Sequence, residues 1–415
     1  MTSQKDQKEQ KQEGMFGRGC ILFLLTCSIV FYLCFGFFVY HAMFSLSDNF
    51  YIEGYMKSRN NTIFGLETFI NCSDWTHSVK EKPFLQELIR HSNSIKDSIN
   101  ITDIKFKSRA TSDIPYELEM NGRLYQLPKK SKKLILLVHG FRMRQNHYTI
   151  IIPIQMLLKA FPDGEYDFMT MEYRNHGFSQ KEYPSNLLPD KSYSTYGSIE
   201  YADVLGAITY ARNLGYEEIG LYGPSMGGAT IMNAYLRSNS QDNIRALFLD
   251  SPACDIEFTL QSNLYRVLGY ALGHSDKLYV ESKRMKIGQY LLWPAVKLMG
   301  TILKGNHPHG PYPPFLNDAY HLWVKEAKSP RSSDKSVALH FDHPESDILV
   351  PKENSERCSA LASSISNLKV TSYYGTVNSK AAKRTFSECK DHCILPLSEP
   401  EQYYERLVKF FKENL

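Results

Sequence analysis

The chain has 415 residues, enough for one large or two medium-sized domains. Its charged fraction of 22% and hydrophobic fraction of 43% are those of an ordinary globular protein. The formal net charge of +4 is small for this length, so we expect no nucleic-acid partner. The eight cysteines include no Cys-x-x-Cys pair and no Cys/His cluster with the spacing of a zinc site, and we expect neither a metal nor a cofactor.

An uncharged apolar segment follows a polar leader. No Asp, Glu, Lys or Arg occurs between Arg18 and Asp48, and residues 19–44 are dominated by Leu, Ile, Phe, Val and Cys. Because about 20 apolar residues cross a bilayer, this segment predicts a transmembrane anchor behind a cytoplasmic leader, residues 1–18. A buried core helix and a cleaved signal peptide are the alternatives. The segment is apolar on every face and too long for a signal peptide, which favours the anchor.

Basic residues and sequons indicate the orientation of this anchor. The leader carries four basic residues and the first residues behind the anchor carry two, so the positive-inside rule keeps the N-terminus in the cytoplasm. Three Asn-x-Ser/Thr sequons follow the anchor: Asn60, Asn71 and Asn100. Sequons in this place agree with a lumenal or extracytoplasmic body in a eukaryote. The sequence therefore predicts a single-pass membrane protein whose larger part lies outside the cytoplasm.

A polar connector, residues 45–100, leads to the rest of the chain, and its best amphipathic stretch is residues 83–90. Short strands are predicted next at residues 104–107, 116–120 and 123–127. Asn121-Gly122, between the last two, predicts a two-residue hairpin turn.

Apolar strands then alternate with helices. The strands are predicted at residues 134–138, 167–172, 219–222, 244–249, 337–341 and 368–373. Helical periodicity is found at residues 198–213, 228–235 and 399–413. This alternation predicts an α/β fold with a mostly parallel central sheet and helices on both faces. Sites in such folds form at the carboxyl ends of the strands.

One long insertion interrupts the alternation. Residues 255–330 lie between consecutive core strands and contain Trp293 and Trp323, and a segment this long needs structure of its own. We expect a mainly helical, apolar cap that divides the core into a first part, residues 101–254, and a second part, residues 331–415. A second hydrophobic core with no substrate role is the alternative.

Gly223-Pro224-Ser225-Met226-Gly227 is the most informative motif of the chain. A Gly-x-Ser-x-Gly sequence between a strand and a helix is typical of a nucleophile elbow, where a serine hydroxyl is exposed on a sharp turn. The flanking glycines are required where the strand and helix backbones approach closely. An ordinary strand-to-helix turn with an idle serine is the alternative.

A serine nucleophile needs hydrogen-bond donors for an oxyanion. His139-Gly140-Phe141 directly follows a predicted strand, so we expect the backbone N–H of Phe141 to be one donor. The backbone N–H of Met226, at the start of the helix behind the elbow, is the second expected donor.

A serine nucleophile also needs an acid and a base. Asp347 is the predicted acid, because it lies in a turn after the strand 337–341 and four residues before Pro351. Asp342 and Glu345 are nearby alternatives. His392 is the predicted base, since it follows the last strand and precedes the last helix; the other histidines considered, His340, His343 and His176, do not.

The chain from about Ile101 to Leu415 resembles the α/β-hydrolase superfamily. The segments that carry the resemblance are His139–Phe141, Tyr173–Ser179, Gly223–Gly228, Asp347–Pro351, and His392 with Pro400–Tyr403. The pattern is similar to membrane-anchored esterase- or lipase-like members and to the serine-aminopeptidase-type group. Two features depart from it: Pro224 replaces a histidine common in lipases, and residues 374–391 lengthen the connection to His392, which Cys389 and Cys393 flank.

The resemblance implies two-step acyl transfer, in which Ser225 attacks a carbonyl, His392 moves the proton and Asp347 orients His392. We therefore predict a membrane-anchored serine hydrolase that cleaves a carboxylic ester of a lipid or other small acyl substrate. A serine peptidase of the aminopeptidase type is the alternative, and a non-catalytic binding protein on the same scaffold is a third hypothesis. The sequence predicts no oligomeric state.

Overall fold

The computed structural model describes residues 82–182, 192–259, 319–328, 336–347, 349–376 and 391–415, together with 23, 26–36, 45, 46, 294 and 298. The predicted leader, the sequons at Asn60 and Asn71, Cys389 and most of the predicted cap lie outside these residues.

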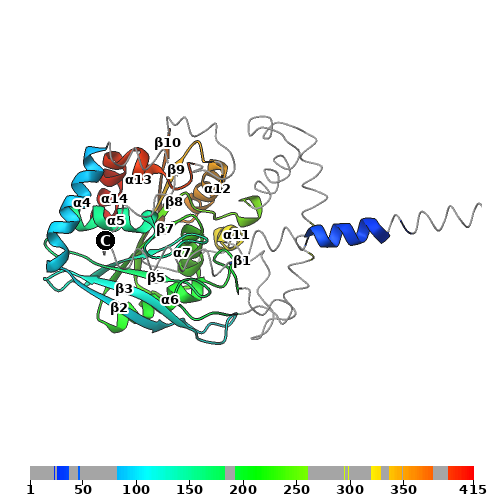
Figure 1. Ribbon diagram of the computed structural model, residues 1–415, viewed down its shortest axis with the longest axis horizontal. Helices are drawn as coiled ribbons and strands as arrows, with labels where there is room; N and C mark the ends of the chain where they lie inside the picture. Colours follow the sequence, from blue (N-terminus) through cyan, green and yellow to red (C-terminus); the bar gives the residue numbers. More distant parts are fainter. Residues whose placement is uncertain are drawn as a thin grey trace, which may run out of the picture.

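The fold is built on a sheet of eight strands in the order β10-β9-β8-β7-β4-β5-β3-β2 (Figure 1). The six strands from β10 to β5 run parallel, whereas β3 and β2 extend this sheet as antiparallel neighbours. The strands are β2 Asn100–Lys107, β3 Glu119–Gln126, β4 Lys133–Val138, β5 Asp167–Glu172, β7 Glu218–Pro224, β8 Ile244–Asp250, β9 Val337–Pro344 and β10 Leu368–Gly375. Each of the six predicted parallel strands is present and begins within one residue of its predicted start.

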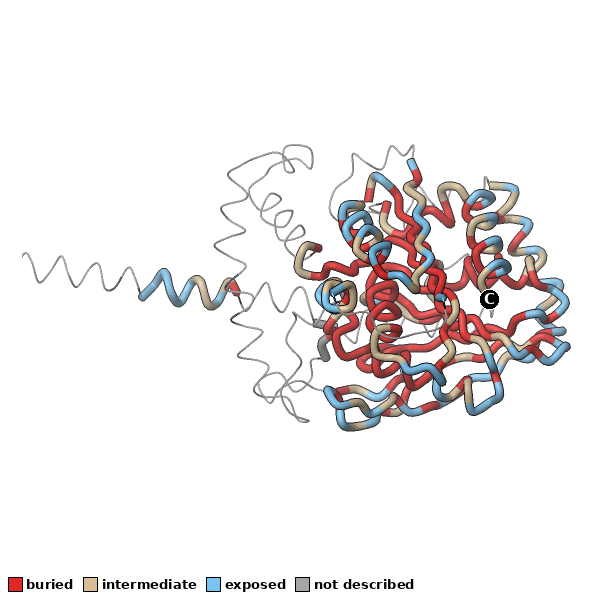
Figure 2. The backbone as a smooth tube through the Cα atoms, turned by 180° about the vertical axis from the view of Figure 1, so that it is seen from behind, coloured by how far each residue is buried: buried red, intermediate tan, exposed pale blue. Residues whose placement is uncertain are grey.

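Helices cover both faces of the sheet, which explains why its central strands β4, β5, β7 and β8 are buried along almost their whole length (Figure 2). One face carries α6 Tyr201–Asn213, α7 Met226–Arg237, α11 Ala319–Lys328 and α12 Lys352–Ser363. The other face carries α4 Pro83–Ile95, α5 Tyr148–Ala160, α13 Leu395–Ser398 and α14 Pro400–Asn414. Helix α4 comes from the predicted connector, and its buried Leu85 and Leu88 pack in the same hydrophobic cluster as α5 and α14. The end of the connector is therefore part of the core.

The predicted hairpin turn at Asn121-Gly122 is wrong. Both residues lie inside the single strand β3, where Gly122 pairs with Ile104 of β2 and Met171 of β5. A Cβ atom on Gly122 would lie 2.5 Å from the backbone oxygen of Thr170. The glycine therefore permits the close approach of two strands, which the local sequence does not distinguish from a turn.

The last part of the predicted cap belongs to the helix layer of the core. Trp323 of α11 is fully buried and stacks on Tyr235 of α7, with the ring centroids 5.9 Å apart. Helix α11 also contacts α12. The apolar residues of α11 therefore pack in the core of the protein.

The described part of the predicted anchor is helical over residues 26–36. Most of its residues are exposed and several are half-buried (Figure 2), and Phe31 is 70% exposed. Among the described residues, no helix has the length and apolar character needed to cross a bilayer. Shortly behind this helix, β1 Ser45–Leu46 pairs antiparallel with β6 Ser192–Tyr193.

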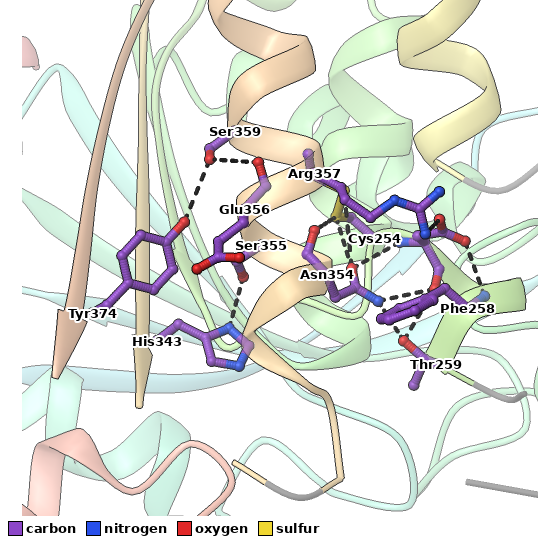
Figure 3. The surroundings of a disulfide bond; sticks show 12 residues. Cys254, Phe258, Thr259, His343, Asn354, Ser355, Glu356, Arg357, Ser359 and Tyr374 are labelled. Carbon is purple, nitrogen blue, oxygen red and sulfur yellow. Dashed lines mark hydrogen bonds and ion pairs between the residues drawn. A yellow bond between two sulfur atoms is a disulfide. The ribbon is translucent and has the colours of Figure 1, made fainter. Parts of the chain in front are cut away.

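A disulfide joins Cys254, behind β8, to Cys358 on α12 (Figure 3). Polar contacts reinforce the same junction. The Asn354 side chain donates to the carbonyl oxygen of Asp255 at 2.9 Å and accepts from its N–H at 2.9 Å, while Arg357 pairs with the Asp255 carboxylate at 2.7 Å. The start of the insertion is therefore fixed to α12.

Removal of this disulfide is expected to destabilise the protein. The cysteines are 104 residues apart, and closing so long a loop restricts the unfolded chain strongly. The double variant Cys254→Ser/Cys358→Ser should lose about 2–5 kcal/mol of unfolding free energy in urea titrations. Reduction of the unaltered protein is the control and should produce a loss of similar size; a midpoint that neither change moves would contradict the disulfide.

Candidate active site

Ser225 lies on a strained turn. Strand β7 ends at Pro224 and α7 begins at Met226, so one residue makes the whole connection. The backbone of Ser225 has φ 56° and ψ −123°, a conformation that a non-glycine residue rarely adopts. Such strain is typical of a nucleophile elbow, as the motif predicts.

The glycines of the motif are explained by close backbone contacts. A Cβ atom on Gly223 would lie 2.5 Å from the carbonyl carbon of Gly227. A Cβ atom on Gly227 would lie 2.6 Å from the backbone oxygen of Val138, at the end of β4. Larger residues at either position would push the helix away from the strands and displace Ser225.

The two predicted oxyanion donors lie on segments next to Ser225. Met226 is the first residue of α7, so its N–H has no acceptor within the helix. Phe141 follows Gly140, and a Cβ atom on Gly140 would lie only 3.2 Å from Cβ of Ser225. Among the described residues, neither the Phe141 nor the Met226 N–H donates to a backbone oxygen. Both are therefore available to a ligand atom.

Asp347 and His392 are hydrogen bonded to each other. Nδ1 of His392 lies 2.6 Å from Oδ2 of Asp347, and the other carboxylate oxygen accepts from the N–H groups of Leu349 and Val350 at 2.8 and 2.9 Å. The carboxylate is buried, and burial raises its pKa. The charge of His392 and hydrogen bonds from His343 and His392 outweigh burial and hold the pKa of Asp347 well below its ordinary value of 3.8.

This hydrogen bond decides the tautomer of His392. The carboxylate can only accept, so Nδ1 of His392 carries the proton, and the other ring nitrogen, Nε2, has a free lone pair when the ring is neutral. The His392 side chain is 9% exposed. In the described chain, Ser225 and His392 are not hydrogen bonded to each other, and such bonds often form only when substrate is present.

Cys393, the residue after His392, joins the base to the elbow. Its buried thiol donates to the carbonyl oxygen of Asp250 at 3.8 Å, and the same oxygen accepts from the N–H of Ser225 at 2.8 Å. The predicted base and nucleophile therefore lie on segments that meet at Asp250, although 167 positions of sequence numbering separate Ser225 from His392 (392 − 225).

The alternative acids make other contacts. Asp342 is buried and paired with Arg406, with Nε and Oδ2 2.7 Å apart. Glu345 is exposed and lies 3.7 Å from Lys352. Neither carboxylate is hydrogen bonded to His392, so of the three candidate carboxylates Asp347 is the one that contacts the predicted base.

One alternative histidine has a role that the sequence did not reveal. Nε2 of His343 lies 2.9 Å from the carbonyl oxygen of Val350 and 3.4 Å from Oδ2 of Asp347. Both partners are acceptors, so Nε2 carries the proton, and Nδ1 accepts from the Ser355 hydroxyl at 2.7 Å. His343 therefore supports the Asp347 turn. His340 and His176 are bonded elsewhere, to Thr371 and to the carbonyl of Arg174.

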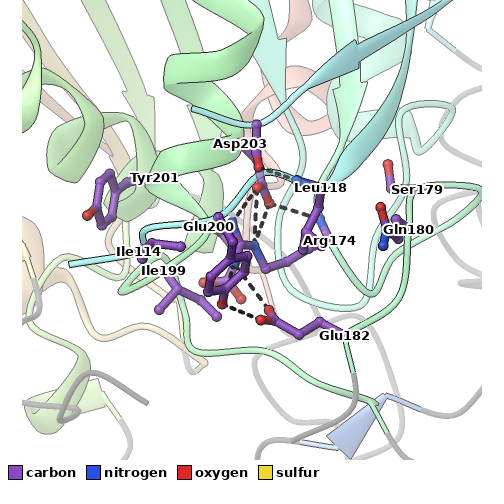
Figure 4. Close-up of polar contacts among 12 residues, drawn as sticks. Ile114, Leu118, Arg174, Ser179, Gln180, Glu182, Ile199, Glu200, Tyr201 and Asp203 are labelled. Atoms are coloured by element: carbon purple, nitrogen blue, oxygen red, sulfur yellow. Dashed lines mark hydrogen bonds and ion pairs between the residues drawn. The ribbon is translucent and has the colours of Figure 1, made fainter. Parts of the chain in front are cut away.

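A buried ionic cluster holds the loop behind β5 (Figure 4). The guanidinium of Arg174 pairs with Asp203 at 2.8 Å and with Glu182 at 3.1 Å, and all three side chains are fully buried. Burial lowers the pKa of Arg174, but the effect of the two carboxylates is larger. The net pKa lies above its ordinary value, so the guanidinium is charged. The loop is thereby fixed beside His139, whose ring lies 4.6 Å from that of Tyr173.

Among the described residues, no group of three His, Cys, Asp or Glu side chains could hold a metal ion. The residues that the sequence predicts for the site are a serine, a histidine–aspartate pair and two backbone N–H groups.

Residues 133–293 match a family model described as the alpha/beta hydrolase fold. Together with the sheet order, this match identifies the α/β-hydrolase fold. The matched region includes Ser225 but ends before Asp347 and His392, so those two assignments rest on geometry. No curated protein matches the sequence.

Several solved esterases resemble the chain at low identity. The Pyrococcus furiosus esterase Pf2001 is 17% identical with a TM-score of 0.47, over 77% of this chain and 95% of that one. Est1E from Butyrivibrio proteoclasticus, with ferulic acid bound, is 17% identical with a TM-score of 0.39, over 71% and 95%. Esterase EaEST from Exiguobacterium antarcticum is 17% identical with a TM-score of 0.40, over 74% and 98%.

The depressed pKa of Asp347 predicts a contribution to acid stability. A carboxyl group whose pKa is lower in the folded than in the unfolded state stabilises the fold above its ordinary pKa, and this stability is lost as the pH falls below about 4. Asp347→Asn should therefore lose less unfolding free energy than the unaltered protein between pH 5 and pH 2.5, as measured by urea titrations at intervals of roughly half a pH unit. Parallel pH dependences for the two proteins would contradict the Asp347–His392 interaction.

Proposed function

We propose that this protein is a serine hydrolase that cleaves carboxylic esters through an acyl-enzyme. The observation that carries the proposal is the hydrogen bond of 2.6 Å between His392 and Asp347, on segments that adjoin the strained turn at Ser225. An idle serine requires neither the strained backbone nor an oriented histidine beside it.

The proposed reaction begins with attack of Ser225 Oγ on the ester carbonyl, while Nε2 of His392 takes the hydroxyl proton. The oxyanion accepts from the N–H groups of Phe141 and Met226. When the tetrahedral intermediate collapses, His392 gives its proton to the departing alkoxide, and the alcohol leaves. Water then attacks the acyl-enzyme with the same proton transfers and releases the acid. Asp347 stays ionised and stabilises the imidazolium of His392.

The surroundings of Ser225 favour an apolar acyl group. Phe141, the expected oxyanion residue, stacks on Tyr196 with the ring centroids 4.5 Å apart. This aromatic pair adjoins the elbow, and an aromatic surface binds acyl chains and aromatic acids by excluding water. A lipid or other apolar acyl ester is therefore the proposed substrate.

Labelling with a fluorophosphonate probe tests the nucleophile. Ser225→Ala should abolish labelling and ester hydrolysis, and Asp347→Asn should lower kcat by about 10³–10⁴-fold because His392 loses its orientation. Glu345→Gln is the matched control, since it removes a carboxylate two positions away that does not contact His392, and it should keep full activity.

A wild-type protein that is folded but unlabelled would overturn the proposal. A panel of p-nitrophenyl esters of increasing acyl length, beside aminoacyl anilides, then identifies the substrate class. Preference for the anilides would indicate the aminopeptidase alternative.

The proposal extends to a membrane-anchored enzyme whose catalytic domain lies outside the cytoplasm. The exposed apolar side chains of residues 26–36 support an apolar environment for that helix. The disulfide between Cys254 and Cys358 supports an oxidising compartment, because structural disulfides are rare in the cytosol. Asn100 and Thr102 of the third sequon are both exposed on β2, a strand at the edge of the sheet.

N-linked glycosylation tests this orientation. The full-length chain, expressed in eukaryotic cells, should lose apparent mass on treatment with a glycosidase that removes N-linked glycans. A variant with Asn60→Gln and Asn71→Gln should keep one glycan, and the further change Asn100→Gln should remove it. Thr102→Ser preserves the sequon and is the control. A wild-type chain without any shift would contradict an extracytoplasmic catalytic domain.

A further inference from the structure

The carboxyl end of β8 contacts all three segments that carry the proposed triad. The carbonyl oxygen of Asp250 accepts from the N–H of Ser225 at 2.8 Å. The N–H of Ser251 donates to the carbonyl oxygen of Asp342, in the strand that leads to the acid, at 2.7 Å. The hydroxyl of Ser251 accepts from the N–H of Cys393, the residue after the base, at 3.2 Å.

We propose that Ser251 is a positioning residue that holds the His392 loop in register with the nucleophile Ser225. This inference rests on the proposed function. Ser251 acts through the backbone of Cys393 and touches no reacting atom.

The direction of the hydrogen bonds supports this role. The Ser251 hydroxyl donates to Oδ1 of Asp250 at 2.9 Å, so its lone pairs face the Cys393 N–H. Tyr403 donates to the other oxygen of Asp250 at 3.0 Å, and Tyr222 lies 3.4 Å from the same oxygen. Because Asp250 is held on both sides, the Ser251 hydroxyl has one orientation.

The backbone conformation makes this contact necessary. Ser251 and Cys393 are fully buried, with φ values of 48° and 52°, in the left-handed region that a non-glycine side chain disfavours. Asp391, on the other side of the base, has φ 55°. Two disfavoured residues around His392 persist only where neighbouring contacts hold them. Without the hydroxyl, the buried N–H of Cys393 would lose its acceptor.

Ser251→Gly tests the proposal, because it removes the hydroxyl while glycine tolerates a positive φ. Asn243→Gly is the matched control. Asn243 lies at the opposite end of β8 with φ 47°, and its side chain also makes a hydrogen bond to the backbone, at Glu217. Both variants thus relieve a left-handed residue and remove one polar side chain, but only Ser251 adjoins the triad.

The variant Ser251→Gly should lower kcat for a p-nitrophenyl ester by about tenfold or more with KM within about twofold, since small displacements of a catalytic group are costly. Asn243→Gly should keep the wild-type kcat. The proton between His392 and Asp347 should give a far-downfield NMR resonance that broadens or disappears in Ser251→Gly and stays in Asn243→Gly. If Ser251→Gly does not fold, Ser251→Ala takes its place in the test, because it removes the same hydroxyl group.

The two readouts separate the proposals. A wild-type protein without activity or labelling overturns the proposed function, and the downfield resonance still decides the role of Ser251. An active wild-type protein with unchanged kcat and an unchanged resonance in Ser251→Gly overturns the positioning role. A lower kcat that also occurs in Asn243→Gly overturns it as well, because the loss would then reflect general destabilisation.

Discussion

The close packing of backbones around Ser225 is the constraint on which the site depends. The turn between β7 and α7 has a single residue, and the first turn of α7 lies against the end of β4 at a distance that excludes a Cβ atom on Gly227. The loop that carries Phe141 lies against the same turn, since a Cβ atom on Gly140 would lie 3.2 Å from Cβ of Ser225. The proposed nucleophile and the proposed oxyanion donors therefore occupy one place because three backbones approach as closely as sterics allow.

The buried carboxyl groups at this edge of the sheet have opposite electrostatic environments. Asp347 is hydrogen bonded to His392, and its pKa is held low, so it is an ion beside the proposed base. Asp250 contacts hydroxyl groups, and burial together with the charge of Asp342 raises its pKa to about 7. The two aspartates differ because Asp347 is hydrogen bonded to imidazoles, whereas Asp250 is hydrogen bonded to hydroxyl groups and lies near the charge of Asp342.

Local patterns in the sequence predict those features that depend on local packing. Strands β4, β7 and β8 near the middle of the sheet are largely apolar because helices cover both faces, so a run such as residues 134–138 marks a strand without further information. The motif around Ser225 is predictable for the same reason. Gly122 is the counterexample, since its small size is required by a strand that lies far along the chain.

Contacts between distant residues explain what the sequence does not predict. Asp347 and His392 could be proposed from their order after the strands, and their functional roles remain predictions. The residues that support them could not be proposed from the sequence. Ser251 and Cys393 are separated by 142 positions, and no pattern near either residue indicates the other. No local sequence pattern distinguishes His343 from the other histidines, and only the fold brings its ring to the Asp347 carboxylate.

The insertion after β8 leaves and rejoins the core at one point. The N–H of Tyr320, at the start of α11, donates to the carbonyl oxygen of Cys254 at 3.0 Å. The chain between them is therefore a closed loop, whose length adds little conformational cost to the fold. Cys254 is also bonded to Cys358 on α12, the helix that begins directly behind the turn of Asp347. The start of the insertion and the turn of Asp347 consequently share one covalent anchor, which couples the position of the proposed acid to the point where the insertion leaves the core.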